Sequence, residues 1–443
     1  MAPRPGDFDD NTAVWLEGAP ESAPEPALGG DAVADVVIIG GGFTGLSTAW
    51  HLIERFPDRR VVILEARAVA NGASGRNGGQ LLHWINGVGY GDPDLVRRVY
   101  EVTDRGIRWV ERMISEHGLP VRHRMDGTLE LVTDARRAEE AQQHAERLQG
   151  WGVPVRWLGR GEVQATLGME GVVGGVLDPH TGVLNGVDFL RGLKSLLLAR
   201  GVVIHEGTPA LKVVEGATIA VETPGGTLRA PALVLATNGY TPRLGYFKSH
   251  LFAMQSHVVA TAPASAETWA GRGWAGAAAF SDDLDRIAYG GLTPDGRLVF
   301  GGGSNASYSY LYGGRTGVIE GAHAAGFRAV EARLRGYWPR VPADAISHRW
   351  SGPLGITLNR QCVMGVRGAH RNVYYALGYS GHGVALANLA GEVLCDLYSD
   401  HHEPWADLPF YKNPPLYIPP EPLRWVGYHV VAGLTGKSPR RHS

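Results

Sequence analysis

The chain has 443 residues, 44% of them hydrophobic and 19% charged, and a formal net charge of −2 at pH 7. The length predicts two domains with sizeable cores, and the charge provides no basic surface for nucleic acid. The two cysteines are too few for a disulfide framework or a zinc site, and no apolar run is long enough to cross a membrane.

Residues 1–31 are rich in proline, alanine and acidic side chains. They lack the basic start and the apolar stretch of a secretory signal peptide, so we expect an N-terminal arm. Two cysteines without CxxC spacing fit buried thiols in a reducing compartment. Together these features predict a cytoplasmic protein.

The first strand is expected at residues 35–39, an apolar run typical of a buried parallel strand. A glycine-rich turn follows at 40–45, then a helical segment, then a second apolar run at 61–64 that ends on Glu65. In a dinucleotide-binding unit the three glycines make the turn, admit the pyrophosphate and allow helix–strand packing. The helix N-terminus offers N–H groups to the phosphates, and the acid accepts from the adenosine ribose. This segment predicts a dinucleotide site.

Three later segments favour FAD over NAD(P). Residues 72–80 combine four glycines with Arg76, Asn77 and Gln80, which suits a loop wrapped around an isoalloxazine ring. An apolar strand at 233–235 ends in the small-residue turn 236–239. Residues 378–383 form a second glycine-rich loop ahead of a helical segment, and that helix end can stabilise the negative charge of a reduced flavin.

Residues 241–347 differ in pattern from the rest. Alternating apolar stretches such as 298–300, preceded by the turn signal Asp295-Gly296, are typical of antiparallel strands. We therefore expect a nucleotide-binding domain interrupted by segments that build a second, sheet-containing domain. The ligand is expected between the two, where pockets commonly form.

With these motifs the sequence resembles the FAD-dependent D-amino-acid oxidase/sarcosine oxidase superfamily, and within it gamma-glutamylputrescine oxidoreductase-like amine oxidases. The most specific matching elements are residues 72–80, 236–239, 350–352 and 378–383. The resemblance implies an α/β fold, with a Rossmann-like FAD-binding domain of the glutathione-reductase type and an inserted mixed or antiparallel-sheet substrate domain. We expect the FAD-binding domain at 32–85, 155–240 and 348–402, the substrate domain at 86–154 and 241–347, and a C-terminal tail at 403–443.

The resemblance also assigns cofactor contacts by position. It implies that Glu65 binds the adenosine ribose with Arg67 beside it, that residues 74–80 skirt the flavin, and that residues 378–384 face its pyrimidine edge. The expected cofactor-binding residues are Gly40, Gly42, Phe43, Thr44, Gly45, Glu65, Ala66, Arg67, Gly72, Ala73, Ser74, Arg76, Asn77, Gly78, Gly79, Gln80, Ala210, Thr237, Asn238, Gly239, Gly352, Gly378, Ser380, Gly381, His382, Gly383 and Val384.

Three positions depart from the family pattern. Gly352 stands where some sarcosine oxidase-like relatives hold a cysteine bonded to the flavin, so we expect noncovalent FAD. Val299 stands where those relatives use a lysine to activate oxygen. Residues 358–362 replace the usual Pro-Asp-x-x-Pro segment, which predicts an altered substrate end of the site.

The reaction implied by the resemblance is oxidation of a C–N bond in a small amine or amino acid. Hydride passes to flavin N5, the imine hydrolyses to an aldehyde or keto product, and O₂ is reduced to H₂O₂. An alternative is an amine or 2-hydroxy-acid dehydrogenase that passes electrons to a quinone or an electron-transfer protein. A nicotinamide-dependent dehydrogenase and a flavin-bearing binding protein are further readings from other classes.

Candidate side chains for this chemistry are few. His382 and Gln80 are the candidate catalytic residues; His382 acts either as an imidazolium beside the ring or as a neutral histidine that bonds the loop. The candidate substrate contacts are His83, Trp84, Tyr308 and Trp350. No histidine or cysteine spacing predicts a metal site.

The tail leaves two interpretations open. Apolar residues between Trp425 and Leu434 precede Lys437, Arg440 and Arg441. A helix packed on the body with a basic end is the favoured interpretation, and a membrane-surface anchor is the alternative. The identity of the amine and the oligomeric state are not predicted.

Overall fold

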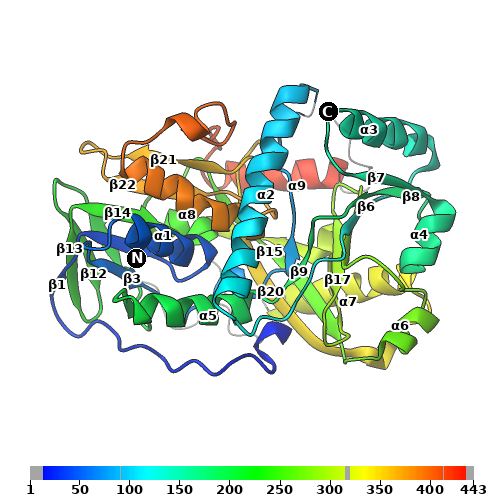
Figure 1. Cartoon of the computed structure of the whole chain (residues 1–443), viewed down its shortest axis with the longest axis horizontal. Coiled ribbons are helices and arrows are strands. Elements are labelled where there is room, and N and C mark those ends of the chain that lie inside the picture. The colour runs from blue at the N-terminus through cyan, green and yellow to red at the C-terminus, as the bar shows by residue number, and fades with distance from the viewer. Residues whose placement is uncertain (1–12, 90, 315–319, 413, 436–443) are drawn as a thin grey trace.

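The computed structural model describes residues 13–89, 91–314, 320–412 and 414–435 (Figure 1). Two sheets, each with its own hydrophobic core, lie next to each other along the long axis of the molecule. This arrangement confirms the predicted α/β fold with a nucleotide-binding domain and a second sheet domain. The first part of the predicted arm, residues 1–12, and the basic end of the tail, residues 436–443, lie outside the described residues.

The first sheet contains the predicted βαβ unit. Five of its strands are parallel, and the edge strand β21 runs antiparallel to β22. The central strands are buried along their whole length, which is why they are near-continuous apolar runs. In order across the sheet the strands are β10 (Val203–His205), β3 (Val61–Leu64), β2 (Val36–Ile39), β14 (Ala232–Leu235), β22 (Val373–Leu377) and β21 (Val363–Arg367).

Helices cover one face of this sheet and a small sheet covers the other. Val36 and Ile38 pack with the helices, whereas Val37 and Ile39 pack against the small sheet, as the alternation of a strand requires. The helices are α1 (Phe43–Arg55), α2 (Pro93–Glu116), α5 (Gly186–Ala199) and α8 (Val384–Tyr398). The small sheet is formed by β1 (Ala32–Val33), β13 (Gly226–Ala230), β12 (Ile219–Thr223) and β11 (Lys212–Val214).

The second sheet is larger and mostly antiparallel, with a core rich in tryptophan and phenylalanine. Its strands are β19 (Tyr308–Tyr310), β15 (Phe252–Thr261), β18 (Leu298–Gly302), β17 (Ala288–Leu292), β16 (Ala279–Asp282), β6 (Thr128–Val132), β8 (Gly174–Asp178) and β7 (Arg156–Gly159), with β20 (Ile346–Ile356) paired to β15. Its helices are α3 (Ala138–Gly150), α4 (Arg160–Leu167), α6 (Ala266–Gly271) and α7 (Glu320–Tyr337).

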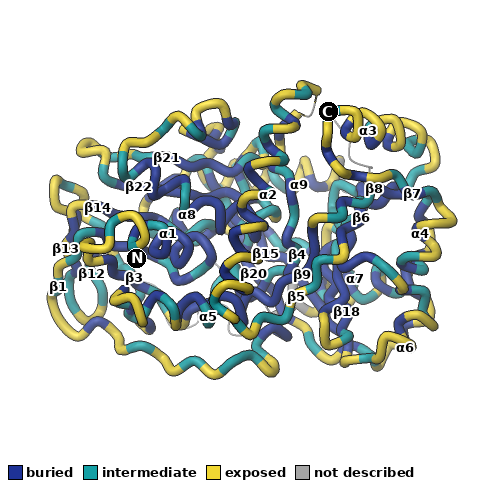
Figure 2. Tube along the Cα trace, in the orientation of Figure 1, coloured by how far each residue is buried: buried dark blue, intermediate teal, exposed yellow. Residues whose placement is uncertain are grey.

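A three-stranded sheet connects the glycine-rich loop at residues 72–80 to the rest of the fold. It consists of β4 (Gln80–Leu81), β9 (Gly182–Leu184) and β5 (His123–Arg124). The last described helix is α9 (Leu423–Thr435). Buried residues occupy both large sheets together with α1 and α8 (Figure 2).

The expected domain boundaries differ from the sheet pairing at three places. Strands β7 and β8 join the second sheet, although residues 155–178 were expected in the FAD-binding domain. β20 pairs with β15 of the second sheet although it begins the expected third FAD-binding segment, and α2 packs on α8 although it was expected in the substrate domain. Strand pairing is a long-range choice that the alternation of a strand does not encode.

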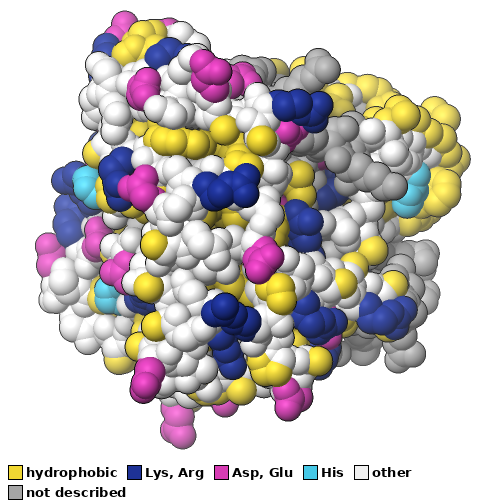
Figure 3. All heavy atoms as spheres, turned by 90° about the vertical axis from the view of Figure 1, so that its right-hand side faces the viewer, with side chains coloured by type: hydrophobic (Ala, Val, Ile, Leu, Met, Phe, Trp, Pro, Cys, Tyr) yellow, Lys and Arg dark blue, Asp and Glu magenta, His cyan; other side chains and the backbone are white. Residues whose placement is uncertain are grey.

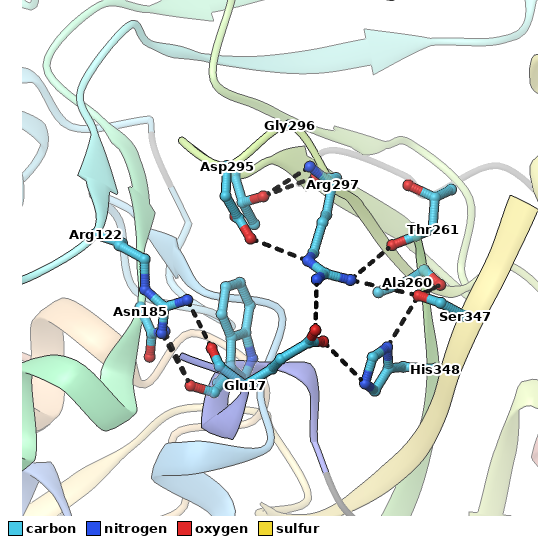
Figure 4. A network of polar contacts seen from close by, with 12 residues as sticks. Glu17, Arg122, Asn185, Ala260, Thr261, Asp295, Gly296, Arg297, Ser347 and His348 are labelled. Carbon is cyan, nitrogen blue, oxygen red and sulfur yellow. Dashed lines mark hydrogen bonds and ion pairs between the residues drawn. The ribbon is translucent and has the colours of Figure 1, made fainter. Parts of the chain in front are cut away.

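The described part of the arm connects the two domains. Trp15 is 3% exposed and donates from Nε1 to the backbone oxygen of Asn77, 2.8 Å away. The Glu17 carboxylate pairs with Arg297 at 3.0 Å and His348 at 3.3 Å, while its backbone oxygen accepts from Arg122 (Figure 4). Residues 13–17 of the arm are therefore ordered, and their contacts hold the two domains together.

Within the described ranges, no helix is both long and apolar enough to cross a bilayer.

Candidate active site

A cavity of about 610 Å³ runs from the carboxyl ends of the parallel strands to the face of the second sheet. This is the edge at which open α/β sheets bind their ligands. Most of the expected cofactor residues line it. These are Gly40, Gly42, Phe43, Thr44, Glu65, Ala66, Arg67, Gly72, Ala73, Ser74, Arg76, Asn77, Gly78, Gln80, Ala210, Thr237, Asn238, Gly352, Ser380, Gly381, His382, Gly383 and Val384.

The glycine turn opens the N-terminus of α1 to this cavity. Gly40 has φ +113°, and a Cβ on it would lie 2.6 Å from the backbone oxygen of Ala236. A Cβ on Gly45 would lie 1.9 Å from the backbone oxygen of Gly40, so Gly45 lets the helix pack on the turn and does not line the cavity. This geometry fits a pyrophosphate resting on free N–H groups.

Glu65 directly follows β3 and lies at the cavity wall. Its Oε2 accepts from the Gly41 N–H at 2.7 Å, and its Oε1 accepts from the Arg67 N–H at 2.9 Å. Burial raises the pKa of this carboxyl, and the two backbone hydrogen bonds partly offset that effect. Each oxygen retains a lone pair for a ribose hydroxyl, so the side chain suits the adenosine end of FAD.

The loop at residues 71–80, here called the flavin loop after the expectation from the sequence, supplies a buried positive charge. Arg76 is 5% exposed and donates to the backbone oxygens of Asn71 at 2.8 Å and Ser351 at 3.5 Å. Asn77 bonds its own loop through the Ser74 oxygen and the Gly79 N–H. Asn77 thus shapes the loop, while the Arg76 guanidinium in the cavity wall can stabilise negative charge.

The second glycine loop is clamped by a residue that the sequence reasoning missed. The Asn86 amide nitrogen lies 2.8 Å from the Ser380 oxygen and 2.7 Å from His382 Nδ1. Because this nitrogen donates in both contacts, Nδ1 accepts and the proton of a neutral imidazole sits on Nε2. Of the two alternatives for His382, this geometry favours the neutral one. Nothing in the spacing around Asn86 distinguishes it from a loop asparagine.

Other expected cofactor residues hold the strand ends together. Asn238 Oδ1 accepts from the Gly378 N–H at 2.9 Å, which connects the ends of β14 and β22. Gly239, Gly378 and Gly79 do not line the cavity. A Cβ on Gly378 would lie 2.6 Å from the Thr357 side chain, so this glycine permits close packing behind the wall.

The half of the cavity on the second sheet is aromatic. Tyr308 lines it as expected, and Tyr310 and Tyr289 line it too. Tyr289 was not singled out from the sequence; its Oη lies 3.0 Å from Ser256 Oγ, and its ring is 2.5 Å from where a Cβ on Gly78 would be. Burial raises the pKa of Tyr289 to about 12, so the phenol is neutral at pH 7.

Charged side chains stand at the outer end of this half. Asp285 Oδ1 accepts from Arg360 at 3.2 Å, and its Oδ2 lies 3.6 Å from Arg286 Nη1. Two guanidinium groups thus face one carboxylate at the cavity wall. Arg360 belongs to the segment in which the sequence departs from the family pattern.

Three of the four expected substrate residues do not line the cavity, which corrects their assignment. His83 is fully buried between Asp178 at 2.7 Å and Asp104 at 3.4 Å, and Trp350 donates to the Arg76 oxygen at 2.9 Å. Trp84 packs near Tyr100. Along this segment Leu82 and Asn86 line the cavity, whereas His83 and Trp84 do not.

Gln80 lines the cavity, but its amide is already engaged. Its Nε2 donates to the backbone oxygens of Phe280 at 2.6 Å and Gly290 at 3.0 Å. Both N–H groups are therefore used to hold the flavin loop against the second sheet. This geometry fits a positioning role better than a catalytic one.

Sulfur and metal chemistry receive no support from the described residues. Cys362 and Cys395 are each 1% exposed and lie outside the cavity lining, and burial raises the pKa of each thiol to about 12. Among the described residues, no three His, Cys, Asp or Glu side chains are grouped as metal ligands.

A family model described as FAD dependent oxidoreductase matches residues 35–397. The chain belongs to this DAO family. The expected superfamily is thereby confirmed, and the enzyme is an FAD-dependent oxidoreductase. The residues present fit this cofactor, because the same cavity contains the N-terminus of α1 for a pyrophosphate and the Glu65 carboxylate for a ribose.

The relatives include oxidoreductases of similar length. The chain is 30% identical over 402 residues to the probable oxidoreductase OrdL of Rhizobium meliloti (strain 1021), with 86% of this chain and 87% of that protein covered. It is 27% identical over 436 residues to gamma-glutamylputrescine oxidoreductase of Escherichia coli (strain K12), covering 92% and 94%.

Solved structures show the same fold. Glycine oxidase from Geobacillus kaustophilus superposes with a TM-score of 0.73 at 21% identity, covering 86% of this chain and 99% of that one. L-proline dehydrogenase from P. horikoshii superposes with a TM-score of 0.66 at 21% identity, covering 85% and 94%.

Proposed function

We propose that the protein oxidises the C–N bond of a small amine or amino acid, giving an imine that hydrolyses to an aldehyde or keto product, with O₂ reduced to H₂O₂. Bound FAD supplies the oxidising power by accepting hydride at N5. The observation that most strongly supports this proposal is one continuous cavity, which joins the nucleotide-binding wall to an aromatic pocket on the second sheet. The names of the relatives, gamma-glutamylputrescine oxidoreductase and glycine oxidase, support this class of substrate.

The aromatic half suits an amine in its reactive form. An amine must be unprotonated before its C–H bond can be oxidised, and a poorly hydrated site disfavours the ammonium. Tyr289, Tyr308 and Tyr310 provide such a wall. The neutral Tyr289 phenol can orient the nitrogen without adding charge.

The opposite wall suits the charge that reduction creates. The Arg76 guanidinium and the N-terminus of α8, at Gly383 and Val384, both line the cavity. A guanidinium group and a helix N-terminus that are in place before the reaction stabilise the negative charge that develops on the flavin. The protein does not have to rearrange for this.

The charged outer end supports an amino acid over a simple amine. Arg286 and Arg360 together carry one more positive charge than Asp285 balances. A substrate carboxylate placed there would restore neutrality.

We further propose that FAD is bound noncovalently. The position of the flavin-linked cysteine is Gly352, where a Cβ would already lie 2.8 Å from Arg76 Cβ. The two thiols of the chain are buried elsewhere. Acid precipitation should therefore release all of the flavin, and flavin that stays with the pellet would contradict this proposal.

An electron acceptor other than O₂ is a second candidate for reoxidising the flavin. Among the described residues that line the cavity there is no lysine, and Val299 is buried in β18 outside the lining. A site without that cation favours the alternative in which electrons pass to a quinone or an electron-transfer protein.

An anaerobic screen tests the reaction directly. Purified yellow protein is mixed under nitrogen with polyamines, N-methyl amino acids, D-amino acids and 2-hydroxy acids, and the loss of the yellow flavin absorbance is recorded. Bleaching by an amine or amino acid is expected. Admission of O₂ then separates the acceptors, because an oxidase regains its colour and releases peroxide, whereas a dehydrogenase needs a quinone or dye. Colourless protein, or flavin that only 2-hydroxy acids bleach, would contradict the proposal.

A further inference from the structure

Exposed hydrophobic side chains are concentrated in one short segment. Of the twelve large hydrophobic residues that are exposed in the described part of the chain, eight lie between positions 416 and 434. Hydrophobic side chains gather where this segment protrudes at the upper right of Figure 3. The eight residues, here called the α9 patch, are Leu416, Tyr417, Leu423, Trp425, Val426, Val430, Val431 and Leu434.

The patch is held in a fixed orientation by the inner side of α9. Asn305 Nδ2 donates to the Ala432 oxygen at 2.9 Å, and Ala432 is buried. Arg424 donates to the Pro419 oxygen at 2.9 Å, and the Glu421 carboxylate accepts from Tyr310 and from the Trp425 N–H. α9 is therefore docked on the body, as the favoured interpretation of the tail expected, and its outer side still presents the apolar residues.

The charged residues that follow Glu421 in the sequence are all basic. After Glu421 the chain contains no acidic residue up to its last position, whereas it contains Arg424, Lys437, Arg440 and Arg441. An apolar helix face followed by basic residues has the composition of segments that lie on anionic lipid surfaces.

The length of α9 restricts how it meets a bilayer. Thirteen residues at 1.5 Å rise span about 20 Å, which is short of the roughly 30 Å hydrocarbon core. A helix of this length lies in the interface plane with its apolar side inward. The docked orientation of α9 leaves that side open.

We propose that the α9 patch binds the surface of an anionic lipid bilayer. A second copy of this chain is the competing occupant of the patch, and the sedimentation-velocity test below separates the two. Leu423 and Val431 belong both to the patch and to the cavity wall, so bilayer binding places the membrane beside the cavity. The proposal goes beyond the proposed reaction and does not depend on it.

Vesicle co-sedimentation of the full-length, FAD-loaded protein tests the proposal. Vesicles of phosphatidylcholine alone are compared with vesicles that also contain phosphatidylglycerol, at low and high salt. We expect binding to the anionic vesicles that weakens as salt rises. The V426E/V430E variant, changed at two positions outside the cavity lining, should bind at least about tenfold more weakly.

The chain offers a matched control. Val33 and Val214 are distant from the patch in sequence, and their exposed fractions of 61% and 42% bracket the 48% and 56% of Val426 and Val430, so V33E/V214E makes the same chemical change off the patch. It should bind vesicles like the unchanged protein. Retained flavin absorbance shows that each variant is folded.

Three results would overturn the proposal. One is absence of sedimentation with anionic vesicles, and another is equal loss of binding in the two double variants. The third is a concentration-dependent dimer in sedimentation velocity that V426E/V430E abolishes, because it would assign the patch to a second copy. A variant with K437Q, R440Q and R441Q should lose the preference for anionic vesicles, and an unchanged preference would contradict the role of the basic end.

Discussion

Thr44 Oγ1 and Tyr379 Oη lie 2.7 Å apart, although 335 positions separate them in the chain. Thr44 belongs to the first turn of α1, and Tyr379 belongs to the loop ahead of α8. Both residues line the cavity, so this one buried contact joins the first glycine motif to the last. Burial raises the pKa of Tyr379 well above its ordinary value, which keeps the phenol protonated.

Removing this hydroxyl should loosen the wall between the two motifs. Tyr379→Phe leaves the buried Thr44 hydroxyl without this partner, and we expect the free energy of unfolding to fall by about 1–2 kcal/mol. FAD should also dissociate more readily from the variant. Urea unfolding and FAD titration measure the two effects. Tyr417→Phe, at a phenol on a 62% exposed residue, is the control and should change neither.

The Glu65 carboxylate should contribute to FAD affinity through its charge. Glu65→Gln keeps the size of the side chain but replaces one acceptor oxygen with an NH₂ group, which cannot accept from a ribose hydroxyl or from a backbone N–H. We expect an FAD dissociation constant at least about tenfold higher, which corresponds to about 1.4 kcal/mol. Glu222→Gln on β12 removes an equal charge outside the cavity lining. Equal affinities for the two variants would contradict the ribose role.

The N-terminal arm should stabilise the protein more through the burial of Trp15 than through the ion pairs of Glu17. Trp15 is buried against the flavin loop, where a Cβ on Gly79 would lie 2.9 Å from its ring. Trp15→Ala should lower the free energy of unfolding by about 3–5 kcal/mol and weaken FAD binding. Glu17→Gln breaks the half-exposed pairs with Arg297 and His348 and should cost less than about 1 kcal/mol. Thermal melts with and without FAD compare the two, and the reverse order would refute this view.

The buried His83 should make stability depend on pH. Burial disfavours its imidazolium, but the hydrogen bonds and charges of Asp104 and Asp178 outweigh burial and raise the pKa of His83. A raised folded-state pKa stabilises the protein fully below the unfolded value of about 6.5, and this stability is lost as pH rises through the folded pKa. The stability difference between unchanged protein and His83→Gln should therefore be largest in mild acid and shrink toward alkaline pH.

Denaturant unfolding across this pH range measures that difference. His123→Gln, at an exposed histidine, should show no such trend. If the stability difference between the unchanged protein and His83→Gln grows with pH, the pKa of His83 is not raised in the folded protein.

Several features of this protein were predictable because they are local. The turn at Gly40 to Gly45 and the acid at Glu65 lie within one βαβ unit, so spacing along the chain already predicts that they meet at one edge of the sheet. The same holds for the glycine loop at 378–383, which opens a helix directly. Side chains such as Arg76 and Tyr308 were found because their segments face the cavity as a whole.

Other features were decided only by tertiary structure. The pairing of β7 and β8 with the second sheet, the clamp by Asn86 and the position of Tyr289 over Gly78 join segments that the chain separates by dozens to hundreds of residues. His83 and Trp350 have the right chemistry for a substrate pocket but are fully buried outside the cavity lining, and in Trp350 the pairing of β20 with β15 sets the direction of the side chain. The sequence by itself therefore determined the cofactor and the family, since backbone turns carry that information. The packing of the two sheets determined which side chains line the cavity, because contacts between distant segments follow the global fold and not the local pattern.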